Sequence, residues 1–171
     1  MKRLIVASAL IVVMATMASA QDREDKYLPQ GYIFAGEGSV HTSGSGTRGL
    51  TQAGAGGEVL LSEGFGIGGE LGVIGRPQHG SGIFSIDPGY RFRRHSKLVP
   101  FVEGGYSRTF ARNDTIPTTN FFNLGGGINY WVSKRAALRL EFRDHLHGNE
   151  YRGAYAMANQ YWDFRIGLTF R

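Results

Sequence analysis

The sequence predicts an all-β protein, a closed antiparallel transmembrane β-barrel of about eight strands in an up-and-down meander. From Gln30 onward, segments of about ten residues alternate apolar side chains with small or polar ones, which is the period of a strand. The chain has 26 glycines, and they lie inside these segments without the spacing of collagen. It has no cysteine, so no disulfide holds the fold together. Stability must come from backbone pairing and burial, and a closed sheet supplies both.

Residues 1–20 have the three-part form of a secretory signal peptide. Lys2 and Arg3 precede an apolar run, and small residues end it at Ala20, which predicts cleavage between Ala20 and Gln21. The run is shorter than the about 20 residues that a transmembrane helix needs. We therefore expect a signal peptide at 1–20, a short periplasmic segment at 21–29 and the barrel at 30–171.

Eight segments carry the strand pattern, at about 30–40, 50–61, 65–74, 82–92, 98–110, 120–131, 138–143 and 162–170. Pro88 is unfavourable in the fourth segment, because proline removes a donor from the hydrogen-bond ladder. Short connections at 62–64, 93–97 and 132–135 alternate with long ones at 41–49, 111–119 and 148–159, and only the connection at 75–81 is too short to fit this alternation. In bacterial barrels the short turns face the periplasm and the long loops face outside, and we expect that orientation here.

One face of the predicted strands carries large apolar and aromatic side chains. In a soluble barrel this face would point inward, and the opposite face would meet water, where a face so rich in glycine is rare. We therefore expect the apolar face to contact lipid, with aromatic residues near the interfaces. The aromatic residues assigned to it are Tyr32, Phe34, Tyr90, Tyr106, Phe122, Tyr130, Phe142, Trp162, Phe164 and Phe170.

The other face would line the lumen, where glycine leaves room for long charged side chains. We expect it to hold a charge network of Glu37, Glu58, Glu70, Asp87, Arg91, Glu103, Arg139, Glu141, Arg143, Asp163 and Arg165. Because the last strand meets the first in a closed barrel, Glu37 and Arg165 are predicted to pair. The carboxylates outnumber the arginines, so some should be hydrated, protonated or bonded to Ser or Asn. Such a lumen would be largely plugged.

Three stretches resemble the small outer-membrane β-barrel domain family, of the OmpA and OmpX kind: FNLGGGINYW at 122–131, LRLEFRD at 138–144 and PFVEGGY at 100–106. The resemblance covers nearly all of the mature chain. It implies location in the bacterial outer membrane, contact with outer-membrane lipid and lipopolysaccharide, and insertion by the barrel-assembly machinery. Family members usually end on an aromatic residue, whereas here Arg171 follows Phe170.

The segment Asp144-His145-Leu146-His147-Gly148-Asn149-Glu150 is the candidate for chemistry. Some small barrels that resemble this one deacylate lipid A with a histidine, a serine and a carboxylate. Here the segment has no serine, and His147 stands where the resemblance would place it. His145, His147 and Glu150 could also be metal ligands, but no further ligand is evident. We predict no catalytic, cofactor or metal site.

These observations favour a non-enzymatic integral outer-membrane protein with a structural or surface-interaction role and an unknown extracellular ligand. The alternatives are a lipid A modifying, deacylase-like enzyme and a narrow, porin-like pore. Without Lys2 and Arg3, 17 Lys and Arg residues face 14 Asp and Glu residues, and this net charge of +3 is too weak to indicate nucleic-acid binding.

Overall fold

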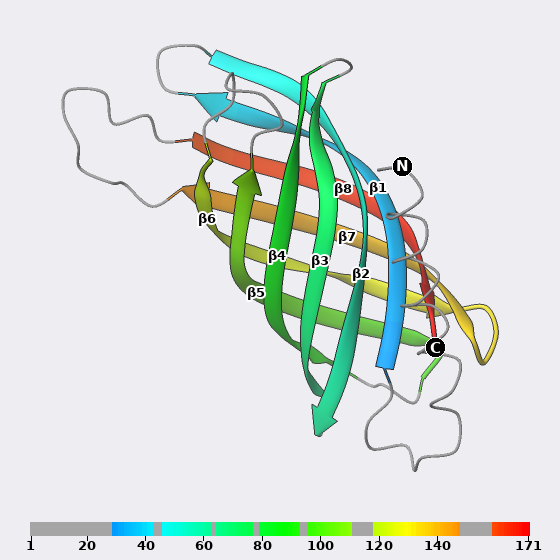
Figure 1. The fold of residues 1–171 in the computed structure, drawn as a ribbon. Coiled ribbons are helices and arrows are strands. Elements are labelled where there is room, and N and C mark those ends of the chain that lie inside the picture. The colour runs from blue at the N-terminus through cyan, green and yellow to red at the C-terminus, as the bar shows by residue number, and fades with distance from the viewer. Residues whose placement is uncertain are drawn as a thin grey trace, which may run out of the picture.

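The computed structural model describes residues 29–42, 46–62, 64–76, 79–92, 96–110, 118–147 and 159–171. Eight strands form one closed barrel in which each is hydrogen-bonded to the next and β8 pairs with β1 (Figure 1). The strands are β1 (Pro29–Thr42), β2 (Gly46–Ser62), β3 (Phe65–Arg76), β4 (His79–Arg91), β5 (Leu98–Phe110), β6 (Asn120–Trp131), β7 (Ala136–His147) and β8 (Asn159–Phe170). The predicted barrel is confirmed. The predicted signal peptide lies outside the described residues.

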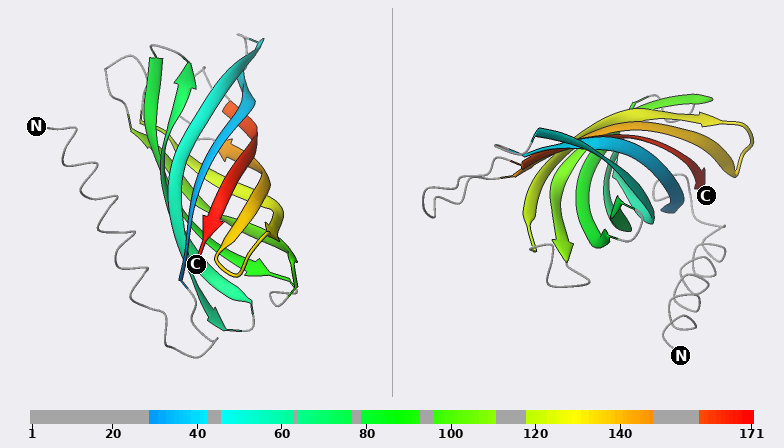
Figure 2. Two further views of the ribbon diagram at one scale, coloured as in Figure 1. Left: turned by 90° about the vertical axis from the view of Figure 1, so that its right-hand side faces the viewer. Right: turned by 90° about the horizontal axis from the view of Figure 1, so that it is seen from above.

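The alternating segments of the sequence become the strands, with small differences at the ends. β5 and β6 span the predicted residues, whereas β2 begins at Gly46, four residues before the predicted start. All eight pairings are antiparallel, and β1 closes the barrel on β8 from Gly31 opposite Phe170 to Thr42 opposite Asn159. Figure 2 shows the strands wrapping around a common axis with a strong tilt. No helix of the described segments has the length and apolar character needed to cross a bilayer.

Pro88 interrupts one ladder, as its missing N–H predicts. The pairing of β4 with β5 runs from Gly82 opposite Phe110 to Ile86 opposite Tyr106, and it resumes at Gly89 opposite Glu103. The register is unchanged across the gap. The strand therefore tolerates the proline without moving its later side chains to the other face.

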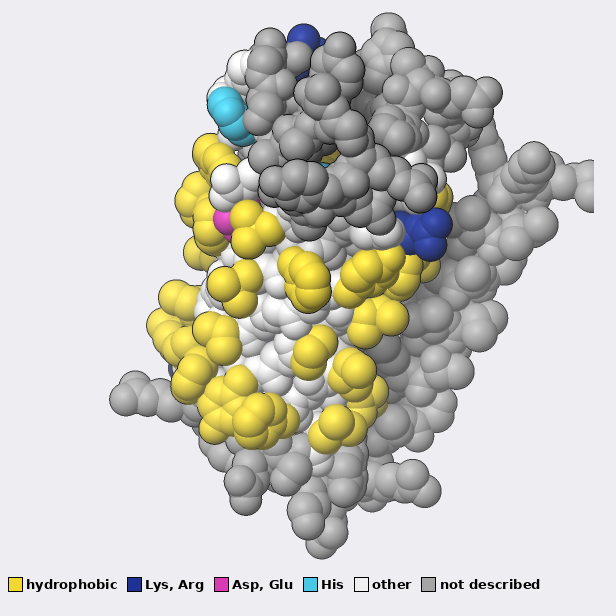
Figure 3. Space-filling model, turned by 90° about the vertical axis from the view of Figure 1, so that its left-hand side faces the viewer, with side chains coloured by type: hydrophobic (Ala, Val, Ile, Leu, Met, Phe, Trp, Pro, Cys, Tyr) yellow, Lys and Arg dark blue, Asp and Glu magenta, His cyan; other side chains and the backbone are white. Residues whose placement is uncertain are grey.

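The outer surface of the barrel is apolar and its interior is polar. Phe122 is 72% exposed and Leu124 66% exposed on β6, while Asn123 between them is buried. Figure 3 shows hydrophobic side chains spread over the outer face of the strands, with the charged side chains in the upper half of the view. This arrangement is the inverse of a soluble domain and suits a surrounding of lipid.

The face assignment of β1 is wrong by one residue. Tyr32 and Phe34 are buried inside the barrel, whereas Ile33, Ala35 and Glu37 lie exposed on the outside. Two of the aromatic residues assigned to the lipid face and one carboxylate assigned to the lumen are thus on the opposite sides. In this strand the inward positions are the even-numbered ones.

Candidate functional site inside the barrel

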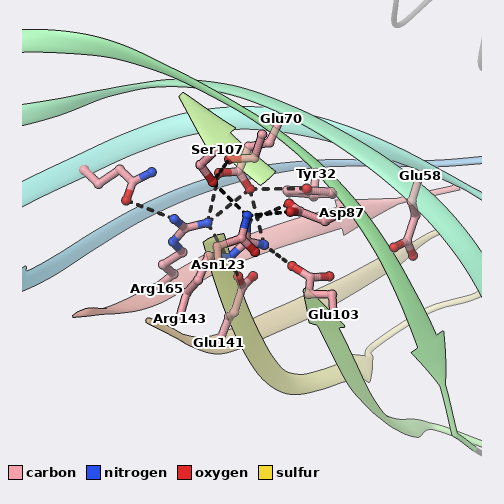
Figure 4. A network of polar contacts seen from close by, with 12 residues as sticks. Tyr32, Glu58, Glu70, Asp87, Glu103, Ser107, Asn123, Glu141, Arg143 and Arg165 are labelled. Atoms are coloured by element: carbon pink, nitrogen blue, oxygen red, sulfur yellow. Dashed lines mark hydrogen bonds and ion pairs between the residues drawn. The ribbon is translucent and has the colours of Figure 1, made fainter. Parts of the chain in front are cut away.

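Ten charged side chains from six strands meet inside the barrel. Each belongs to a residue no more than 5% exposed. They are Glu58, Glu70, Asp87, Arg91, Glu103, Arg139, Glu141, Arg143, Asp163 and Arg165. Figure 4 shows the arginine and carboxylate groups converging from opposite walls of the barrel. We call these residues the lumen network.

Arg143, on β7, lies at the centre of the lumen network. Its Nη1 is 2.7 Å from Oδ2 of Asp87, and its Nε is 2.7 Å from Oε1 of Glu141. Its Nη2 contacts Glu103 and lies 3.7 Å from Oε2 of Glu70. One guanidinium thus joins carboxylates from β3, β4, β5 and β7. An arginine that bridges a lumen in this way cannot be replaced by a shorter side chain without leaving carboxylates unpaired.

Toward the short turns, two more arginines share Glu103. Arg139 binds it at 3.1 Å and binds Glu141 at 2.8 Å, and Arg91 binds it at 3.1 Å while also contacting Glu58. The ring of Phe101 lies between the two guanidinium groups, 4.4 Å from Arg91 and 4.0 Å from Arg139. Stacking on an aromatic face and ion pairing therefore hold these arginines together.

Toward the long loops, Arg165 on β8 is the last cation. Its Nη1 is 3.0 Å from Oε1 of Glu70, its Nε is 2.9 Å from Oδ2 of Asp163, and its Nη2 donates to Oε1 of Gln52 at 3.0 Å. Glu70 also accepts a hydrogen bond from the Tyr32 hydroxyl at 3.3 Å. Arg165 thus extends the lumen network from β8 across the barrel to β2 and β3.

Stacking on arginine explains why β1 turns its aromatic residues inward. The Arg139 guanidinium lies 4.5 Å from the Tyr32 ring centre, and the Arg165 guanidinium lies 4.6 Å from that of Phe34. The neighbouring inward positions on β2 are Gly54 and Gly56, where an added Cβ would come within 2.7 and 2.5 Å of the two rings. The rings occupy the space that these glycines leave.

The predicted pair of Glu37 with Arg165 is wrong for the same reason. Glu37 is opposite Phe164 in the register and faces outward with it, whereas Arg165 is opposite Gly36. An added Cβ at Gly36 would lie 3.0 Å from Cγ of Arg165. Because Gly36 has no side chain, the Arg165 side chain has room to extend into the lumen. There it forms ion pairs with Glu70 and Asp163.

Neutral polar residues complete the contacts, and the sequence predicted only that some Ser or Asn side chains would bind carboxylates. Asn123 donates to Asp87 and to the Ser107 hydroxyl, both at 2.7 Å, and the hydroxyls of Ser107 and Ser85 are 2.8 Å apart. Each lies at a position that strand alternation places inside. The alternation could therefore have identified their direction, but not their partners.

The lumen network contains six carboxylates and four arginines, so it has an excess of acid. One of these carboxylates, that of Asp87, accepts a hydrogen bond from the neutral side chain of Asn123. Oδ1 of Asp163, in contrast, has no hydrogen-bond partner among the described residues. Asp87 therefore binds Asn123 in addition to Arg143 and not instead of it.

Apolar side chains lie at both ends of the lumen network. Toward the long loops, Ile74, Ile83 and Tyr161 form a buried cluster. Toward the short turns, Val99, Trp131 and Ala137 form another, and the Arg171 guanidinium lies 3.8 Å from the Trp131 ring centre. The ion pairs in the middle thus have an apolar cluster on each side.

The histidine segment does not form a catalytic or metal arrangement in the described residues. His145 is buried, stacks on Tyr161 with ring centres 4.0 Å apart, and has Nε2 2.8 Å from the tyrosine hydroxyl. Asp144 is on the opposite face of the strand and accepts a hydrogen bond from Gln160 at 2.8 Å. His147 contacts the backbone oxygen of Asn120 at 2.9 Å. The described residues contain no group that could hold a metal ion, and the predicted ligand Glu150 lies outside them.

The other predicted lipid-facing aromatic residues lie on the outer surface, with Tyr90 half-buried there. Ring contacts join some of them to neighbouring aromatic residues. Tyr90 packs edge-on against Phe65 and Phe92 near the short turns, with ring centres 4.9 and 4.8 Å apart. Near the middle of β7 and β8, Phe142 packs against Phe164 with ring centres 5.0 Å apart. The outward set comprises Tyr90, Tyr106, Phe122, Tyr130, Phe142, Trp162, Phe164 and Phe170.

Several solved structures share this fold. The N-terminal β-barrel domain of Pseudomonas aeruginosa OprF is 14% identical with a TM-score of 0.64, and the match covers 86% of this chain and 98% of that one. Neisserial surface protein A is 12% identical with a TM-score of 0.63, covering 83% and 96%. Ail, the attachment invasion locus protein of Yersinia pestis, is 9% identical with a TM-score of 0.54, covering 86% and 100%.

Sequence comparison gives the family directly. No curated protein matches the sequence. The model of the outer membrane protein beta-barrel domain matches residues 7–170, which is most of the chain. The solved structures above have the same fold as this chain. The apolar outer surface is consistent with a family of membrane barrels. The chain belongs to the outer membrane protein beta-barrel domain family.

Proposed function

We propose that this protein is an integral outer-membrane barrel whose lumen is sealed, and that its role is structural or in interactions at the cell surface. The lumen network carries this proposal. Four arginines and six carboxylates cross the interior, and buried apolar clusters lie on both sides of them. An eight-stranded barrel has an interior just wide enough for side chains to fill, which supports a lumen without an open path for solutes.

With a filled interior, the parts that can meet partners are the outer surface and the two ends. The loops joining β1 to β2, β3 to β4, β5 to β6 and β7 to β8 would face outside, where lipopolysaccharide surrounds them. The name of Ail refers to attachment and invasion, and a surface role of this kind suits a barrel without a pore. Export by a signal peptide cleaved after Ala20 and insertion by the barrel-assembly machinery belong to the same proposal.

Conductance measurements test the sealed lumen. Purified, refolded protein in a planar lipid bilayer should give no stable ion current, whereas Arg143→Ala, which removes the side chain that bridges the lumen, should give small current steps. A mobility shift between unboiled and boiled samples on a gel establishes that each protein is folded. A stable current through the wild-type barrel would contradict the proposal and favour the narrow pore.

The enzyme alternative has its own measurement. The lipid A of cells with and without the gene is compared by mass spectrometry. We expect the same acyl chains in both, because His145 stacks on Tyr161 inside the barrel and Asp144 lies on the opposite face of the strand. Loss of an acyl chain only when the gene is present would favour a deacylase.

A further inference from the structure

Exposed cations gather on one side of the barrel end that carries the short turns. They are Lys97 before β5, Lys134 and Arg135 between β6 and β7, and Arg171 after β8. Backbone contacts bring these three segments together. Trp131 donates to the backbone oxygen of Lys97 at 2.7 Å, and Arg171 donates to that of Arg135 at 3.1 Å. We call Lys97, Lys134, Arg135 and Arg171 the basic rim.

The turn at the centre of the basic rim is held in one shape. The hydroxyl of Ser133 accepts hydrogen bonds from the backbone N–H groups of Arg135 at 3.2 Å and Ala136 at 3.0 Å. Such serine contacts fix a turn. Nε of Arg171 donates to the backbone oxygen of Lys134 at 3.2 Å. The cations at this turn are therefore presented by an ordered backbone.

Directly beside the basic rim, the outer surface is apolar. Leu98, Tyr130 and Phe170 are exposed there, each next to or within four residues of one of the cations. No Asp or Glu side chain is exposed among the described residues of this barrel end. A ligand that suits this surface has an anionic group at the rim and hydrocarbon against the strands.

We propose that the basic rim binds the phosphate of an anionic phospholipid, phosphatidylglycerol, in the leaflet that surrounds the short turns. Cations next to an anionic lipid surface attract its headgroups, and lysine and arginine both donate to phosphate oxygens. The apolar strand surface receives the acyl chains. This inference rests on the proposed membrane-spanning function. It goes further by naming one lipid and the end of the barrel that binds it.

Native mass spectrometry of the folded barrel in detergent tests the proposal. The protein is titrated with phosphatidylglycerol and, separately, with phosphatidylcholine of the same chains. A variant with Lys134→Gln and Arg135→Gln removes two cations from the basic rim. A control with Arg48→Gln and Arg108→Gln removes two exposed cations from the opposite end.

We expect the wild type to retain phosphatidylglycerol in preference to phosphatidylcholine. In the rim variant this preference should fall at least about fivefold, which is the effect expected for the loss of one cation. The control should keep the preference, and added salt should weaken it. Equal retention of both lipids by the wild type, or an equal loss in both variants, would overturn the proposal. The gel mobility shift distinguishes failure of the lipid site from failure of the barrel itself. A protein that shows the shift but lacks lipid preference is a folded barrel without this site.

Discussion

Replacing Arg143 with methionine tests whether ion pairs hold the interior of the barrel together. The residue is fully buried, and its guanidinium lies 2.7 Å from both Asp87 and Glu141 and also contacts Glu103. Methionine keeps much of the volume but removes the charge. Breaking a buried ion pair by removing one partner costs about 3 to 5 kcal/mol, so the folding constant should fall by roughly two to four powers of ten.

Unfolding by guanidinium chloride in detergent, followed by tryptophan fluorescence, measures this loss. Leu124→Met on the lipid face is the matched control and should change the free energy of unfolding by less than about 0.5 kcal/mol. Adding Asp87→Asn to the Arg143→Met variant should restore part of the stability, because it removes one stranded charge. A loss below about 0.5 kcal/mol for Arg143→Met would mean that the lumen charges are hydrated like surface pairs, and would refute the argument.

Other substitutions separate the two faces of the barrel. Leu140→Arg, at a position 50% exposed on the outer surface, should destabilise the barrel in lipid vesicles by about 2 to 4 kcal/mol. Folding as stable as that of the wild type would contradict the outward assignment. Glu37→Gln should leave the free energy of unfolding within about 0.5 kcal/mol of the wild type, whereas a clear loss would return Glu37 to the lumen. Tyr32→Phe should cost about 1 kcal/mol in the same denaturation assay, because it removes the hydroxyl bound to Glu70, and no loss would argue against that contact.

The strands were predictable because closure in lipid imposes one pattern on every segment. β5 and β6 span the predicted residues, since buried and exposed side chains alternate along the length of each strand. β1 was not predictable in the same way. Its sequence has aromatic residues at alternate positions, and the rule that places them in lipid ignores that arginine can stack on them inside.

The partners within the interior were harder to predict than its members. Adjacent strands in the sequence predict pairs between neighbouring strands, but arginine is long enough to cross an eight-stranded lumen. Arg143 on β7 reaches Asp87 on β4, and Arg165 on β8 reaches Glu70 on β3. Such pairs depend on the diameter of the closed barrel and on the glycines around each side chain, and neither follows from the pattern of a single strand.

The distribution of the lumen charges constrains the order of assembly. The hairpin of β7 and β8 contributes three arginines and two carboxylates, and β2 with β3 contributes two carboxylates without an arginine. Neither hairpin can neutralise itself, so each would carry unpaired charge if it entered the hydrocarbon alone. We therefore expect the hairpins to keep their inner faces in water until β8 joins β1, and the interior to lose most of its water only when that last seam forms.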